Sequence, residues 1–179
     1  TPANAAFGPD RFIANHVTGG TVDWIKAADA PTAAEAGVYA THCLHLDVTA
    51  TDTSIATTDQ YNILYNVEGL DAARFGFGQA GTRYVTLSFW VKSTKTGAFY
   101  CSLQNNGADR TYIAPYTVSS GDVWEFKTLV IPVDTSGTWL YTTGVGIRIR
   151  WTLMAGSSFF GTASAWQAGN LRCASDQVN

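Results

Sequence analysis

Two arginines separated by a single residue are the feature of this sequence that most clearly suggests chemistry. The segment GVGIRIRW, residues 144–151, places Arg148 and Arg150 between apolar residues that alternate with them. In a β-strand, alternate residues project from the same face, so both guanidinium groups lie on one side of the sheet. A guanidinium is a planar fork of donors that suits carboxylates and neighbouring hydroxyls. The pair predicts a ligand-binding sheet face; two solvated arginines paired with acidic residues are the alternative.

Neighbouring segments offer aromatic and polar partners for these arginines. A shallow glycan site requires aromatic rings that stack on sugar rings and a few fixed polar groups. Alternation predicts outward-facing residues of both kinds in the adjacent strands, and two arginines favour acidic sugars. The expected carbohydrate-binding residues are Arg148, Arg150, Tyr100, Gln104, Tyr112 and Trp90. Trp166 is a second candidate platform, whereas Trp124 and Trp151 are assigned to the core.

Catalytic and metal-binding patterns are weak. No nucleophile-elbow or phosphate-binding glycine motif occurs, and an acid–base pair of carboxylates cannot be assigned from sequence. His42 and His45, three residues apart on a strand, point to opposite faces and do not indicate zinc. We therefore expect a protein that is not an enzyme and needs no cofactor. A structural calcium ion is possible. Its oxygen donors would be Asp10, Asp47 and Asp176, although these aspartates do not have the D-x-D-x-D spacing of a calcium-binding loop.

The rest of the chain indicates an all-β domain. Of its 179 residues, 46% are hydrophobic and only 14% are charged, and the net charge is −3, which argues against a nucleic-acid partner. No apolar run is long enough to insert into a membrane. Short alternating segments are separated by Gly, Asn and Ser turns, as in sandwiches and barrels. We expect one jelly-roll β-sandwich of two antiparallel sheets over residues 1–179, with one small helix or helical turn and an irregular segment, 1–37, packed on it.

Several motifs resemble those of a known family, the carbohydrate-binding-module-like jelly-roll domain of phage tail and head fibres and related virion or gene-transfer-agent appendages. The matching motifs include LSFWVKS at 87–93, the Asn-rich turn at 105–106, Arg-x-Tyr at 110–112, WEFKT at 124–128 and TSGTW at 135–139. Members of that family usually continue into a final strand that is not found before Asn179, so we expect either that the sequence is a fragment with a further strand after 179 or that this strand comes from elsewhere. Jelly-roll polysaccharide lyases are similar in fold class, but their Gln-x-His and Arg-x-Glu-x-x-Arg motifs do not occur here.

The resemblance implies a non-catalytic domain on the virion surface that binds host cell-surface polysaccharide for attachment. It would be assembled in the host cytoplasm, beside other virion proteins, as a homo-oligomer in which a trimer is favoured. Two alternatives stay open: a structural fibre or capsid-decoration domain that makes oligomer contacts, and an accessory module of a polysaccharide-degrading enzyme. The three cysteines, Cys43, Cys101 and Cys173, are far apart and are expected to be free buried thiols.

Overall fold

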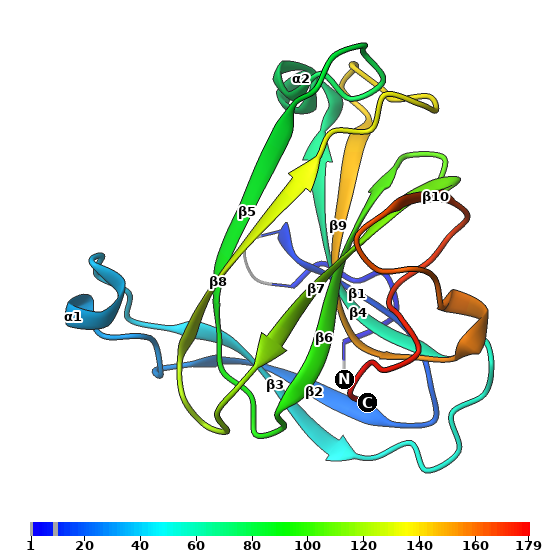
Figure 1. The fold of residues 1–179 in the computed structure, drawn as a ribbon. Coiled ribbons are helices and arrows are strands. Elements are labelled where there is room, and N and C mark those ends of the chain that lie inside the picture. Colours follow the sequence, from blue (N-terminus) through cyan, green and yellow to red (C-terminus); the bar gives the residue numbers. More distant parts are fainter. Residues whose placement is uncertain (1, 9–10) are drawn as a thin grey trace.

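The structure, a computed structural model, describes residues 2–8 and 11–179 and confirms the expected all-β sandwich (Figure 1). The named strands pair only in the antiparallel sense. The strands are β1 Ile13–Val17, β2 Thr21–Ala27, β3 Cys43–Ala50, β4 Gln60–Glu68, β5 Tyr84–Val91, β6 Gly97–Asn105, β7 Arg110–Val118, β8 Glu125–Pro132, β9 Val145–Ala155 and β10 Trp166–Ala168. The helices are short: α1 Ala33–Ala36, α2 Gly69–Ala72 and the 3-10 turns η2 Ala73–Phe75 and η3 Ser157–Phe159.

A six-stranded sheet forms the centre of the molecule, in the order β1-β4-β9-β6-β7-β10. The strands β5 and β8 form a separate two-stranded sheet that packs over one of its faces, and β2 and β3 form another. Within the described residues, no helix is both long and apolar enough to cross a membrane.

The main core lies between the six-stranded sheet and β5–β8. Alternate residues of β6 and β9 enter it, including Leu103, Ile147 and Trp151, as the apolar alternation of these segments predicts. Large aromatic rings fill the end of this layer: the Phe77 and Trp139 ring centroids are 4.4 Å apart, and Trp166 packs edge-on against Trp139 at 5.6 Å. The burial of these apolar faces is the dominant favourable contribution to folding.

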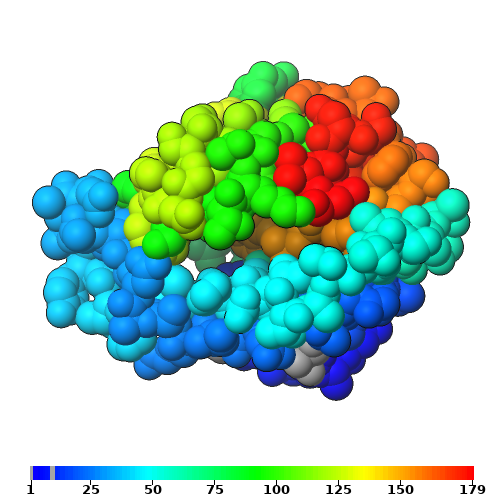
Figure 2. All heavy atoms as spheres, turned by 90° about the horizontal axis from the view of Figure 1, so that it is seen from below, coloured from blue at the N-terminus to red at the C-terminus, as the bar shows by residue number. Residues whose placement is uncertain are grey.

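The other face of the six-stranded sheet is partly covered by the C-terminal segment, residues 156–179. Leu171 and Cys173 of this segment pack with Tyr100 and Ile113 of the sheet in a second, smaller core. In Figure 2 the C-terminal residues (red) lie against the middle of the chain (green) and the residues near 155–165 (orange). Both faces of the central strands are therefore buried, which the strand alternation alone does not reveal.

The N-terminal part is more regular than expected. The segment 1–37 contains β1, which extends the six-stranded sheet, and β2, which pairs with β3. Helix α1 begins with a complete capping box, in which Thr32 and Glu35 satisfy each other's backbone N–H groups. It lies at the end of an arm that projects to one side of the sandwich (Figure 1).

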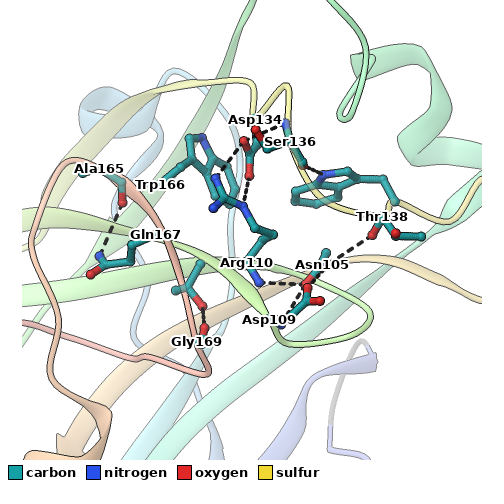
Figure 3. Close-up of polar contacts among 12 residues, drawn as sticks. Asn105, Asp109, Arg110, Asp134, Ser136, Thr138, Ala165, Trp166, Gln167 and Gly169 are labelled. Carbon is teal, nitrogen blue, oxygen red and sulfur yellow. Dashed lines mark hydrogen bonds and ion pairs between the residues drawn. The ribbon is translucent and has the colours of Figure 1, made fainter.

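Several motifs that carry the family resemblance form one structural network (Figure 3). Arg110 makes a bidentate ion pair with Asp134, with Nε–Oδ2 at 2.6 Å and Nη2–Oδ1 at 3.0 Å, and Asp134 is only 4% exposed. Asn105 donates to the carbonyl of Thr138 at 3.0 Å and accepts from the backbone N–H of Arg110. The Asn-rich turn, the Arg-x-Tyr strand and the TSGTW turn are thus held together by hydrogen bonds. They specify the fold rather than a ligand.

Candidate ligand-binding face

The predicted arginine pair does lie on a single face of the six-stranded sheet. In the strand register, Arg148 is opposite Gln104 and Arg150 is opposite Ser102 on β6. On the other side of β9, Asn66 of β4 is opposite Arg148. We call this side the arginine face. Its principal residues, from β4, β9 and β6, are Asn62, Asn66, Arg148, Arg150, Ser102 and Gln104.

The expectation that both arginines are exposed is wrong for Arg150. Only 6% of Arg150 is exposed, and its Nη1 donates a hydrogen bond to Oε1 of Gln104. The reason is the C-terminal segment, which crosses the face and accepts hydrogen bonds from Gln104 through Asn170 and Leu171. Burial, together with the nearby charges of Arg172 and Arg148, lowers the pKa of Arg150 well below its usual range.

Arg148 remains partly exposed. Its Nη1 donates to the backbone carbonyl of Asn106 at 2.5 Å, and its Nη2 donates to the Asn106 side-chain oxygen at 3.2 Å. These bonds hold the guanidinium beside the β6–β7 turn. Among the described residues no partner is recorded for its Nε, so this arginine keeps donor capacity for a ligand.

A third arginine, Arg172, reaches this face from the C-terminal segment. It is 2% exposed, and its Nε donates to Gln60 at 3.0 Å while its Nη1 donates to Asn170 at 2.6 Å. Its guanidinium lies 4.9 Å from the Phe159 ring. Burial, and to a smaller extent Arg148, lowers its pKa. Sequence reasoning missed this residue, because a lone arginine outside any regular strand carries no periodic signal.

The three arginines lack acidic partners. Among the residues that the structure describes, the ion pairs involve other cations, namely Arg74, Lys92, Arg110 and Lys127. Arg148, Arg150 and Arg172 instead donate to neutral amide and carbonyl oxygens. The alternative in which the sheet arginines pair with Glu125 or aspartates is therefore wrong: Glu125 pairs with Lys127 at 2.5 Å.

Unsatisfied polar atoms gather on the same face. Five buried side-chain atoms on it have no hydrogen-bond partner among the described residues: Asn15 Oδ1, Asn62 Oδ1, Asn66 Oδ1, Ser102 Oγ and Arg150 Nε. Their placement follows from the register, in which Asn15 of β1 is opposite Asn62. Buried polar groups are normally paired, so these atoms keep hydrogen-bonding capacity for water or for a ligand.

A shallow hollow of about 360 Å³ opens at the end of this face, beside Asn66. Its lining comes from the end of β4 and the start of β9: Asn66, Glu68, Thr143, Gly144 and Val145. Helix α2 packs so closely against β9 here that a side chain at Gly146 would not fit: its Cβ would lie 2.7 Å from the Gly69 Cα. Gly146 of the GVGIRIRW segment is therefore needed for the close approach of α2 to β9, whereas Gly144 is not under this constraint.

Of the other predicted site residues, Tyr100 and Gln104 lie on the arginine face as expected, whereas Tyr112 and Trp90 do not. Gln104 and Tyr100 share the arginine face but are buried, and the Tyr100 hydroxyl donates to Asp176 at 2.5 Å. Tyr112 is opposite Leu103 and points into the main core, so its predicted outward position is wrong. Trp90 lies on the outer face of β5–β8, where its ring packs 5.3 Å from Phe126. Tyr112 and Trp90 therefore do not face the arginines, and Tyr100, which does share their face, is too buried to serve as a stacking platform.

The predicted positions of Trp166 and Trp124 are also wrong. Trp166, a predicted exposed platform, packs against the main core and donates to the carbonyl of Pro132 at 2.6 Å. Trp124, predicted to be buried in the core, lies at the surface, where its Nε1 donates to Asp29 at 3.1 Å and Lys92 lies 5.7 Å from its ring. Trp151 packs against the core as expected.

The aspartates considered for calcium do not form a site. Asp10 is outside the described residues, Asp47 is exposed on β3, and Asp176 accepts the hydrogen bond of Tyr100. In the described part of the chain, no group of three His, Cys, Asp or Glu side chains could hold a metal ion. The three cysteines are free, and Cys101 and Cys173 are buried as expected, whereas Cys43 is only partly buried.

Comparisons of this chain with protein-family models, with curated proteins and with solved structures found no match.

Proposed function

We propose that this domain binds host cell-surface polysaccharide without chemical turnover, as an attachment domain on a virion surface. The observation that carries the proposal is the arginine face: a sheet face rich in arginine, asparagine and glutamine, with unpaired polar atoms, which ends in an open hollow. Because none of the predicted aromatic residues is an exposed platform on this face, the polysaccharide would be held by hydrogen bonds and charge rather than by ring stacking. The virion setting rests on the resemblance of the motifs at 87–93 and 105–139.

The absence of turnover is proposed because Glu68 is the only carboxylate among the residues that line the hollow. Glycoside hydrolysis usually requires two carboxyl groups on either side of the bond. Incubation with acidic and neutral polysaccharides should release neither reducing ends nor unsaturated sugars. Turnover that survives repurification and disappears in Glu68→Gln would contradict the proposal.

The binding itself is tested by screening the protein against immobilised bacterial capsular and cell-wall polysaccharides. Asn66→Leu removes the amide at the hollow while it keeps the branched shape and the number of side-chain heavy atoms, and it also removes an unpaired buried oxygen. We expect this variant to melt at or above the wild-type temperature and to bind at least about fivefold more weakly. Trp90→Ala, on the opposite side of the molecule, is the control and should bind as wild type. Absence of binding to every polysaccharide would reject the proposal.

A structural role is the second candidate, and the outer face of β5–β8 favours it. This face carries exposed apolar side chains, with Tyr84 at 63%, Phe126 at 54% and Val130 at 60% exposure. Several exposed apolar side chains on one sheet face often mark a protein–protein contact. If copies of this chain assemble through it, Phe126→Ser with Val130→Thr should reduce the oligomer measured by light scattering. An unchanged mass would exclude this face as the contact.

A further inference from the structure

We infer that Arg148, Arg150 and Arg172 together form an anion site that takes the carboxylate or sulfate group of an acidic sugar. This inference rests on the proposed function and names the chemical class of its ligand. The three guanidinium groups come from two strand positions and from the C-terminal segment, and no carboxylate in the described residues pairs with them.

The burial of Arg150 and Arg172 without a carboxylate partner among the described residues is energetically unfavourable. A buried charge without a counter-ion is destabilising, because its lost hydration is not replaced. Arg110, in the same domain, shows the usual solution, a bidentate pair with Asp134. Arg150 is 6% exposed and has only the neutral Gln104 side chain as a hydrogen-bond partner. Unfavourable arrangements of this kind are typical of functional sites.

An anion in solvent can reach this cluster through Arg148. Arg148 is the partly exposed member and is held in place by Asn106, so the anion contacts it directly. Arg150 and Arg172 are buried close enough to Arg148 to feel its charge, and they add to the positive potential, which is strong where water is excluded. The Nε of Arg150 is buried and has no partner among the described residues, so its link to the anion would be through a water molecule.

Thermal melts at constant ionic strength test the site with free anions. Sodium glucuronate should raise the melting temperature of the wild type in a saturable way, by about 3–6 °C at ten times its dissociation constant. Glucose should give no such shift. Sulfate stabilises proteins in general, so its specific effect is the difference between the wild type and a variant. A wild-type response to glucuronate and sulfate that equals the response to chloride would overturn the inference.

Variants locate the effect. Arg148→Gln should lose the saturable shift, because it removes the direct contact. Arg150→Met should give a smaller shift and melt, in chloride, at or above the wild-type temperature. A much lower melting temperature for Arg150→Met, or a full anion shift in Arg148→Gln, would show that the cluster is structural.

Polysaccharide binding separates this inference from the proposed function. An anion shift without binding to any polysaccharide supports the anion site and rejects the proposed function. Equal affinity for neutral and acidic polysaccharides, with no anion shift, rejects the anion site and leaves the proposed function in place.

Discussion

The buried guanidinium of Arg150 donates its only recorded side-chain hydrogen bond to the neutral oxygen of Gln104, in the same sheet where Arg110 is paired at 2.6 Å with the carboxylate of Asp134. The two arginines belong to adjacent parts of one β-sandwich, yet their electrostatic environments are opposite. Arg110 is neutralised and serves the fold. Arg150, with Arg148 and Arg172, forms a positive face whose charge is not balanced by the described side chains.

The two tryptophans Trp139 and Trp124 should differ sharply in their contribution to stability. Trp139 is 8% exposed and lies in the main core, so Trp139→Ala should lower the free energy of unfolding by about 3–5 kcal/mol. Trp124 lies at the surface with Asp29 and Lys92, and Trp124→Ala should cost only about 1 kcal/mol. Chemical denaturation measures both. Equal losses would mean that Trp124 is a core residue after all.

The ion pair of Arg110 with Asp134 should be important for folding and irrelevant to ligand binding. Arg110→Gln leaves the carboxylate of Asp134 buried and unpaired, and should lower the free energy of unfolding by about 3 kcal/mol. The matched control is Arg74→Gln, which breaks the exposed pair with Asp71 and should cost less than about 0.5 kcal/mol. Similar effects in the two variants would contradict the structural role of the 105–139 network.

Glu125 should make stability depend on pH in the acidic range. Its carboxylate accepts bonds from Lys127 and from the backbone N–H groups of Ser120 and Ser119, which lowers its pKa to about 2. Because its folded-state pKa lies below the unfolded value, its stabilising contribution is present above about pH 4.5 and is lost as the pH falls towards 2.

Glu125→Gln should therefore melt below the wild type at pH 7, and the difference should shrink between pH 4.5 and 2. Glu68→Gln, for which no equivalent set of hydrogen bonds is recorded, is the control. A Glu125→Gln difference that is constant over this range would show that ionisation of Glu125 is not responsible.

Strand alternation was sufficient to predict the fold class and the common face of Arg148 and Arg150. It failed where both faces of a strand carry apolar residues. In β7, Tyr112 and Ile113 point to opposite faces and both are buried, so alternation could not tell which face is the core. In β8 the odd-numbered residues Leu129 and Ile131 face the core. The even-numbered residues face away from it, and Trp124, which has the same alternation as they do, therefore lies outside the core.

The coverage of the arginine face could not be predicted from local pattern at all. Residues 156–179 contain only one short named strand, β10, and their position depends on contacts across the chain, such as that of Arg172 with Gln60. Contacts between residues so distant in sequence leave no periodic signal.

The central claim, that the arginine face binds acidic polysaccharide, is tested most directly by calorimetric titration of an acidic capsular polysaccharide into the wild type and Arg148→Gln. We predict at least tenfold weaker binding for the variant, about 1.4 kcal/mol, with an unchanged melting temperature and a wild-type affinity that falls as salt is added. Equal affinity of the two proteins, or loss of binding in Trp90→Ala instead, would contradict the claim.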